Sequence, residues 1–186
     1  MFGQKPLTKF LSFVWEIAKI VVVAALIVAP IRYFLFQPFL VRGQSMEPNF
    51  ENGDYLIVDE ISYRFKNPRR GEVIVFKYPN NSSQRFIKRI IGLPGEIIEI
   101  KNGKITIQED KSSQVLNELD YLPLLKTTGD IKVELGENEY FVLGDNRAYS
   151  FDSRRFGPLS EEKIIGKVFL RAWPFVDLKK FGAPAY

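Results

Sequence analysis

The first residue that could do chemistry is Lys88, which lies in the run Arg85-Phe-Ile-Lys-Arg-Ile-Ile91. β-Branched and aromatic residues of this kind are typical of a strand, in which side chains alternate between two faces. Lys88 therefore shares a face with Phe86 and Ile90, while the two arginines take the opposite face. An ammonium group in apolar surroundings loses solvation, so its pKa falls and the neutral amine becomes available as a base. The alternative is a surface lysine, exposed on an edge strand or snorkelling from an apolar patch.

A second candidate is Ser45, in the turn Gly43-Gln-Ser-Met-Glu-Pro48. A turn bounded by Gly and Pro can expose a hydroxyl and leave backbone N–H groups free for an oxyanion. The chain has no His and no Cys, which excludes a Ser-His-Asp triad, a cysteine nucleophile and most zinc sites. A serine nucleophile would therefore need a lysine or a carboxylate as its base. The alternative is a loop serine that hydrogen-bonds its own backbone.

A third segment, from Gly144 to Gly157, is dense in short polar side chains and directly follows an apolar strand. Such a segment can form a hydrogen-bond network that orients the neighbouring strands. The alternative is a solvated loop that carries surface ion pairs.

The amino-acid composition limits the class of protein and the kinds of site to which these residues can belong. The 186 residues suffice for one compact domain with an appendage, and a hydrophobic content of 46% supplies a core. The net charge is only +4 and no basic run stands out, so we expect no nucleic-acid binding. With no His or Cys, we also expect no metal ion and no cofactor.

The apolar run 17–36 predicts a transmembrane anchor, because a helix of this length spans about 30 Å, the thickness of the bilayer core. Residues 1–16 contain Lys5 and Lys9, which favour a cytoplasmic N-terminal segment, although basic residues also follow the run. Residues 37–186 would then form an extracytoplasmic domain. The alternatives are a buried core helix and a cleaved signal peptide; a Pro-containing aromatic segment follows the run, which favours a retained anchor.

Beyond the anchor, short β-type runs alternate with turn signals such as Asn102-Gly103, which predicts a tight hairpin. Many short strands with regular turns indicate a mainly β domain, an antiparallel barrel or folded sheet. Residues 108–132 break the rhythm, and we expect a surface excursion there. The predicted strands cover residues 55–58, 72–77, 85–91, 96–100, 104–107, 139–143 and 166–171.

Together the three candidate segments resemble type I signal peptidases, over roughly residues 13–177. The single N-terminal apolar run agrees with this family, and so does the order of the family's four boxes. They are Ser45-Met-Glu-Pro48; Gly53-Asp-Tyr-Leu-Ile-Val58; Arg70-Gly-Glu-Val-Ile-Val-Phe76 with Phe86-Ile-Lys-Arg-Ile-Ile-Gly-Leu-Pro-Gly-Glu96; and Gly144-Asp-Asn-Arg147 through Ser150, Asp152, Ser153 and Arg154.

The resemblance implies a Ser-Lys dyad, in which Ser45 attacks the scissile carbonyl and neutral Lys88 takes its proton. The main-chain N–H of Ser45 would donate to the oxyanion. Some relatives carry a hydroxyl donor two residues before the nucleophile, where this chain has Gly43. The Thr that usually follows the first box is replaced by Asn49.

The resemblance also implies a network around the base. Ser150 would hold the Lys88 amine in position, and Asp152 would form a supporting salt bridge with Arg154. Asp145 would belong to the same network.

From the resemblance we expect a signal-peptidase and self-cleaving-repressor type of β-fold on a single transmembrane helix, in the plasma (inner) membrane. The protein would be a monomeric serine endopeptidase that meets the lipid bilayer and cuts signal-peptide-bearing preproteins through an acyl-enzyme. Substrates would carry small residues, often Ala, at the first and third positions before the cut. Candidate pocket walls are Phe39, Val41, Met46, Phe50, Phe86 and Ile87.

Two alternatives remain from the residues. A self-cleaving repressor shares the dyad but needs a DNA-binding domain in place of the anchor. A membrane-tethered β-module that only binds partners would have no need for both Ser45 and Lys88.

Overall fold

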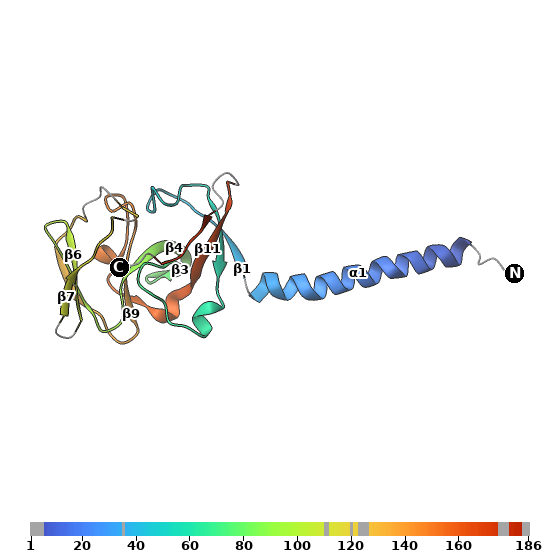
Figure 1. Ribbon diagram of the computed structural model, residues 1–186, viewed down its shortest axis with the longest axis horizontal. Helices are drawn as coiled ribbons and strands as arrows, with labels where there is room; N and C mark the ends of the chain where they lie inside the picture. The colour runs from blue at the N-terminus through green and yellow to red at the C-terminus, as the bar shows by residue number, and fades with distance from the viewer. Residues whose placement is uncertain are drawn as a thin grey trace. The chain divides into compact units, whose positions relative to one another are not determined.

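The computed structural model describes residues 6–34, 36–109, 112–119, 121–122, 127–174 and 179–183 (Figure 1). The chain divides into two units, 1–37 and 38–186, each of which is described by itself. The first unit is essentially one helix, and the second is built of strands.

Helix α1 spans Pro6–Phe34, so it begins before the predicted anchor at residue 17. Within it, Phe10–Val28 is long and apolar enough to cross a membrane, and none of this stretch is buried in the protein. The predicted anchor extended too far at its other end, because Phe36 opens strand β1. One turn of the helix carries an exposed ion pair, in which Lys19 Nζ lies 2.7 Å from Glu16 Oε1.

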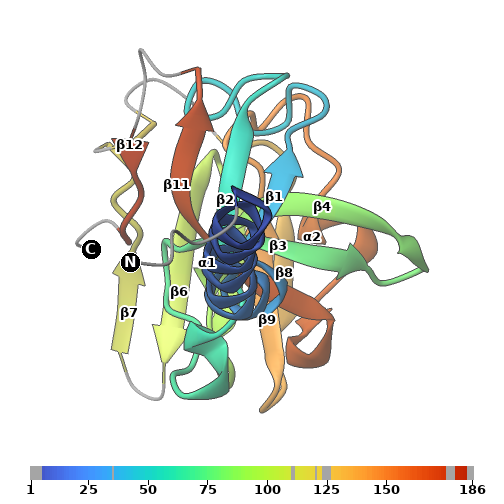
Figure 2. The ribbon, with the colours of Figure 1, turned by 90° about the vertical axis from the view of Figure 1, so that its right-hand side faces the viewer.

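The larger sheet contains strand β4 between β3 and β9. Its strand order is β1-β2-β11-β3-β4-β9-β10 (Figure 2). Strand β11 comes late in the chain yet lies between β2 and β3, so it joins these two early strands in the sheet. The pairings of β2, β3, β4, β9 and β12 are antiparallel. The strands are β1 (Phe36–Leu40), β2 (Tyr55–Asp59), β3 (Val73–Tyr78), β4 (Asn81–Gly92), β9 (Glu139–Leu143), β10 (Leu159–Ser160), β11 (Ile164–Trp173) and β12 (Lys179–Lys180).

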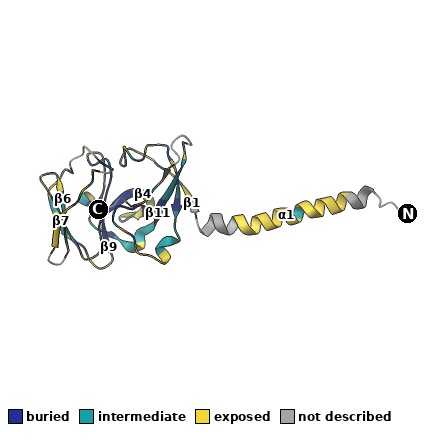
Figure 3. Ribbon diagram, in the orientation of Figure 1, coloured by how far each residue is buried: buried dark blue, intermediate teal, exposed yellow. Residues whose placement is uncertain are grey.

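The smaller sheet has the order β7-β6-β5-β8 and confirms the predicted hairpin. Strands β5 (Ile97–Lys101) and β6 (Lys104–Glu109) pair up to Lys101 and Lys104, and only two residues join them. These two, Asn102 and Gly103, have φ of 52° and 79°, the left-handed conformation that an Asn-Gly turn of this length requires. The outer strands are β7 (Ser112–Val115), exposed throughout (Figure 3), and β8 (Ile131–Glu134).

The prediction of a surface excursion at 108–132 is wrong for several of its residues. The segment contains β7, and the side chains of Leu116, Leu122 and Thr127 are buried. Glu118 pairs with the buried Arg147. The buried leucines, although they stand among polar residues in the sequence, pack this segment against the core. Its stretches 110–111, 120 and 123–126 lie outside the described residues.

Three apolar clusters cover both faces of β4. Ile87 packs against the cluster of Val41, Met46 and Phe50, while Phe86 and Ile90 belong to the cluster of Ile74, Phe76 and Tyr140. The third cluster fills the smaller sheet and reaches Ile91. The strand is therefore buried on both sides over its second half. Short helical turns η1 (Ser62–Arg64), α2 (Ser153–Phe156) and η2 (Glu161–Lys163) complete a mainly β domain, as predicted.

Candidate active site

Strand β4 fixes the position of Lys88. Lys88 pairs with Ile74 of β3, and the next residue, Arg89, pairs with Leu143 of β9. The Lys88 side chain is 3% exposed. The alternative of a surface lysine is therefore wrong.

The turn that carries Ser45 is held from several directions. Within the turn, the Glu47 N–H donates to the Gln44 carbonyl, and the Phe50 N–H donates to the Met46 carbonyl. The fully buried side chain of Met46 anchors the turn in the core. The Asn146 N–H donates to the Ser45 carbonyl at 3.1 Å.

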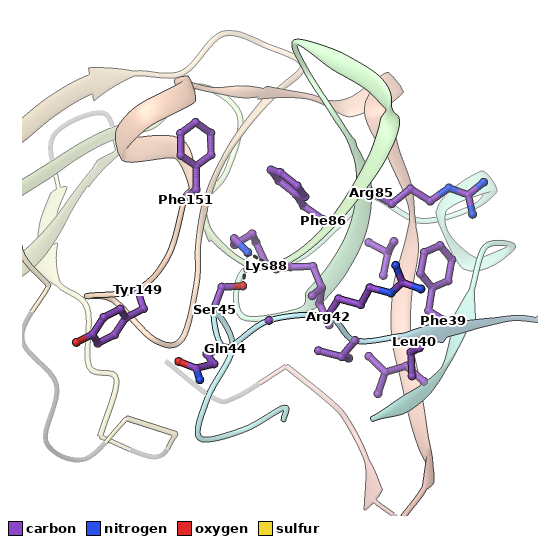
Figure 4. Close-up of a pocket in the computed structure, with 15 residues that line it drawn as sticks. Phe39, Leu40, Arg42, Gln44, Ser45, Arg85, Phe86, Lys88, Tyr149 and Phe151 are labelled. Atoms are coloured by element: carbon purple, nitrogen blue, oxygen red, sulfur yellow. Dashed lines mark hydrogen bonds between the residues drawn. The ribbon is translucent and has the colours of Figure 1, made fainter. Parts of the chain in front are cut away.

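Ser45 and Lys88 face each other, with Lys88 Nζ 2.7 Å from Ser45 Oγ (Figure 4). The Lys88 Nζ also lies 2.7 Å from the Ile87 carbonyl oxygen. Among the described residues no carboxylate forms an ion pair with Lys88. Burial lowers the pKa of Lys88 to about 8, although the negative charges of Asp152 and Asp145 oppose this fall. The arrangement is that of a hydroxyl next to an amine that deprotonates near neutral pH.

Arg89 lies on the other face of β4 and is also buried, which sequence reasoning missed. Its guanidinium binds Asp145 in a two-pronged contact of 2.8 Å (Nε) and 2.6 Å (Nη2). The Asn49 amide donates to Asp145 Oδ2 at 2.8 Å and so joins the same group. Asp145 thus belongs to the last box by sequence but pairs with β4. Knowing that this face of β4 is buried would have predicted a charged partner for Arg89. The alternation of side chains along a strand does not show whether a face is buried.

Asp152 organises the remainder of the last box. It lies 2.8 Å from Arg154 Nη2, and the Gly144 N–H donates to Asp152 Oδ2 at 3.1 Å. It also caps α2, since its side chain accepts from the Arg154 N–H. The salt bridge that the resemblance implies between Asp152 and Arg154 is therefore present.

The expected hydrogen bond between Ser150 and the Lys88 amine is absent from the described structure. Ser150 is buried, and its Oγ has no hydrogen-bond partner there. It packs instead beside the nucleophile turn: a Cβ on Gly144 would lie 2.2 Å from Ser150 Oγ and 2.4 Å from the Ser45 carbonyl oxygen. A residue without a side chain at 144 lets this segment approach Ser45.

The backbone N–H groups around Ser45 include a donor that can serve the reaction. The Gly43 N–H donates to Asn52 Oδ1 at 2.9 Å, so it is already engaged. The Ser45 N–H makes no hydrogen bond to any described residue. It can therefore donate to an oxyanion that forms at a carbonyl attacked by Ser45.

A cavity of about 380 Å³ opens over the dyad. Four of the predicted wall residues line it: Phe39, Val41, Phe86 and Ile87. The prediction was wrong for Met46 and Phe50, which are fully buried in the core behind the turn. Met46 follows Ser45 directly, so its side chain leaves the turn on the side away from the cavity. The other lining residues are Leu40, Arg42, Gly43, Gln44, Ser45, Leu56, Val75, Arg85, Lys88, Tyr149 and Phe151.

Within the described ranges, no group of three or more His, Cys, Asp or Glu side chains is arranged to hold a metal ion.

Comparison with known proteins adds to this geometry. Residues 14–173 match the family model described as "Signal peptidase, peptidase S26". The chain is 37% identical over 166 residues to "Probable signal peptidase I-2" of Synechocystis sp., covering 86% of this chain and 73% of that protein. It is 40% identical over 162 residues to "Signal peptidase I" of Bacillus caldolyticus, covering 82% of this chain and 88% of that protein.

One solved structure, a signal peptidase I from Enterococcus faecalis V583, matches with a TM-score of 0.47. It shares 35% identity and covers 55% of this chain and 97% of the solved chain.

Proposed function

The chain belongs to the signal peptidase family, peptidase S26, whose members remove signal peptides from preproteins, and we propose that Ser45 and Lys88 perform this cleavage here. The family is one of serine endopeptidases, and this chain is one of them. A single observation carries the assignment of roles: the buried Lys88 amine, unpaired among the described residues, lies 2.7 Å from the Ser45 hydroxyl.

Acylation begins with the neutral Lys88 amine. It accepts the proton of the Ser45 hydroxyl while Oγ bonds to the scissile carbonyl carbon. The carbonyl oxygen becomes an oxyanion and accepts a hydrogen bond from the Ser45 N–H. When the intermediate collapses, the Lys88 ammonium gives its proton to the leaving amine, and the acyl group remains on Ser45.

Deacylation repeats the same proton movement. Lys88, neutral again, accepts a proton from a water molecule that attacks the acyl carbon, and Ser45 Oγ leaves with a proton from Lys88. The lowered pKa of Lys88 favours the free amine at the start of each step.

The substrate has a ready-made place to bind. Strand β9 pairs with β4 only from Arg89 to Gly92, so the outer edge of β4 before Lys88 is unpaired in the described structure. An extended peptide can add its main chain to this edge. Its small side chains at the first and third positions before the cut would then contact the apolar wall of Phe39, Val75 and Ile87.

The location in the membrane is also part of the proposal. The helix Phe10–Val28 anchors the chain in the plasma (inner) membrane as a single span. Lys5 and Lys9 precede it, which favours a cytoplasmic N-terminus and an extracytoplasmic catalytic domain. Ser45 follows Phe34, the last residue of α1, by eleven residues (45 − 34), so the chain itself keeps the nucleophile within reach of the membrane that also holds the preprotein.

The orientation can be tested cleanly because the chain has no Cys. A single cysteine introduced as Lys132→Cys, at an exposed position of β8, should react with an impermeant maleimide added outside intact cells. Gly3→Cys should stay protected until the membrane is opened. The reverse labelling pattern would contradict the orientation and leave the enzymatic assignment intact.

The roles are tested with the full chain in detergent and a preprotein carrying an Ala-x-Ala site. Ser45→Ala and Lys88→Ala should each abolish cleavage, and the double variant should be little worse than either, because the two residues act as a unit. Ser45→Ala should also abolish labelling by a serine-acylating probe. Lys132→Ala serves as the matched lysine control. Near-normal turnover by Lys88→Ala would refute the dyad.

A further inference from the structure

The cavity over the dyad carries two positive charges that the cleavage mechanism does not use. Arg42 and Arg85 both line it, and both side chains are exposed. Among the described residues that line the cavity there is no Asp or Glu. In the described part of the chain neither guanidinium forms an ion pair.

Both arginines lie at the same end of the cavity. They extend toward Phe39, whereas Tyr149 lies on the other side of Ser45 (Figure 4). The Arg85 guanidinium lies over the Phe39 ring at 5.3 Å, a contact that holds the charge at the rim. Burial raises the pKa of Glu60, and the charge of Arg85 opposes this rise from a distance, since no ion pair joins these two described residues.

The sequence spacing sets how far these charges are from the chemistry. Arg85 precedes Lys88 by three residues (88 − 85), and Arg42 precedes Ser45 by three (45 − 42). In strand β4, which contains both Arg85 and Lys88, three residues cover about 10 Å. The segment from Arg42 to Ser45 bends at Gly43 and Gln44, so Arg42 lies no farther than this from Ser45. An extended peptide whose first residue before the cut lies at the dyad therefore reaches the arginines with its fourth or fifth residue.

The side of the cut follows from the apolar wall. Along β4, Ile87 lies between Lys88 and Arg85, and under the proposed function the apolar wall to which it belongs takes the small residues before the cut. The arginines then meet the fourth or fifth residue before the cut.

We propose that Arg42 and Arg85 form a specificity subsite for an acidic side chain at the fourth or fifth position before the cleavage site. The inference rests on the proposed function, since it uses that cleavage direction. Arginine suits this role because its planar fork binds a carboxylate with two hydrogen bonds. The same charges disfavour a basic side chain at these positions.

The test uses short soluble peptides with an Ala-x-Ala site, assayed first without vesicles and then with anionic vesicles. One series carries Glu, Gln or Lys at the fourth position before the cut, and a second series carries them at the fifth. In at least one series the full chain should cleave the Glu peptide about three- to tenfold better than the Lys peptide, measured as kcat/KM at low ionic strength. The preference should appear mainly in KM and shrink in salt.

Charge-reversed variants sharpen the result. Arg42→Glu with Arg85→Glu should invert the preference, so that the Lys peptide is cut better than the Glu peptide. Lys132→Gln, which removes a positive charge on the smaller sheet, should leave the preference as it is.

Four outcomes would overturn the subsite. They are equal cleavage of the Glu and Lys peptides, a preference that survives charge reversal, a preference that Lys132→Gln also removes, and an effect of the arginines seen only with anionic vesicles. The last result would assign the two arginines to the lipid surface. In each case cleavage of the Gln peptide would leave the proposed function standing, whereas failure to cut any peptide would refute that function.

Discussion

Lys88 and Arg89 are neighbours in β4, and their side chains are 3% and 5% exposed, yet the strand places them in opposite electrostatic surroundings. On one face Arg89 binds Asp145 and donates to the Gly71 carbonyl. On the other face Lys88 meets a serine hydroxyl and a backbone carbonyl.

The difference shows how one strand makes a structural cation and a reactive one. A buried charge is tolerable when it is paired and hydrogen-bonded, and Arg89 satisfies both conditions. A buried ammonium without an ion-pair partner avoids the free-energy cost of a buried charge by losing its proton. The lowered pKa of Lys88 is the consequence. Guanidinium stays protonated in proteins, so only the lysine face can supply a base.

The sharpest way to break this comparison is to exchange the two cations singly. Lys88→Arg should lower kcat/KM by about 10³-fold or more, because the guanidinium cannot accept the Ser45 proton. Arg89→Lys should lower it by less than about tenfold, since a positive charge stays next to Asp145 and the side chain lies on the face of β4 away from Ser45. Both are measured on an Ala-x-Ala peptide. Equal losses in the two variants would show that the faces are not separated in function.

Removing the paired cation should cost the most stability. Arg89→Met leaves Asp145 buried without its partner, and the free energy of unfolding should fall by about 3–5 kcal/mol. Thermal unfolding of the full chain in detergent measures the change. An unchanged unfolding temperature would show that the Arg89–Asp145 pair does not stabilise the domain.

Replacing Lys88, which has no ion-pair partner among the described residues, should raise the free energy of unfolding. The folded state binds the Lys88 proton with a pKa of about 8, against 10.5 for an ordinary lysine, so folding is penalised by about 3 kcal/mol below pH 8. The penalty fades as pH rises from 8 to 10.5, where only the unfolded chain holds the proton. Lys88→Met should therefore be inactive yet more stable than the parent at pH 7, with a gain that disappears near pH 10.5. A less stable variant at pH 7 would contradict the unpaired state of this lysine.

The pH profile of activity should report the same group. Below pH 8 the ammonium form of Lys88 returns, so kcat/KM should fall by about tenfold for each further pH unit. Arg89→Lys should leave this fall at acid pH where it is, because Lys88 and not the Arg89–Asp145 pair is the group whose protonation limits the activity. A profile flat down to pH 6 would exclude a lysine base.

The smallest effect on stability and activity should come from replacing Asn49, which contacts Asp145 on the Arg89 side of β4. Its amide donates to Asp145 Oδ2 and to the Tyr121 carbonyl. Asn49→Ala should lower the free energy of unfolding by about 1–2 kcal/mol and change kcat/KM by less than about threefold. A loss of activity as large as that of Lys88→Arg would place Asn49 in the chemistry instead.

Much of this was accessible from the sequence, and the rest depended on contacts between distant residues. Local patterns predicted the strands and the Asn102-Gly103 turn, because alternation and turn chemistry act over a few residues. The ordered boxes singled out Ser45 and Lys88. The pairing of Arg89 with Asp145 was not predictable in this way, since 56 residues separate the two and alternation does not say which faces are covered.

The errors have the same origin. Met46 was expected at the cavity because it adjoins the nucleophile, but burial in the core turns its side chain away. Ser150 was expected on the lysine amine, yet its hydroxyl packs beside the Ser45 carbonyl where a side chain at 144 would not fit. Sequence proximity to a site indicates membership of the region, and only packing decides the direction of a side chain.

The hydrogen bond from Asn146 to the Ser45 carbonyl bears on how the protein is made. The two residues are 101 positions apart (146 − 45), and a ribosome delivers the serine first. While the later part of the chain is still being synthesised, the turn around Ser45 lacks this support, and Lys88 lacks the neighbouring strand that buries it. We therefore expect the nascent polypeptide to be inactive as a protease until translation has passed the last box. Under the proposed function, the enzyme would stay inactive while its own apolar helix is inserted beside its substrates.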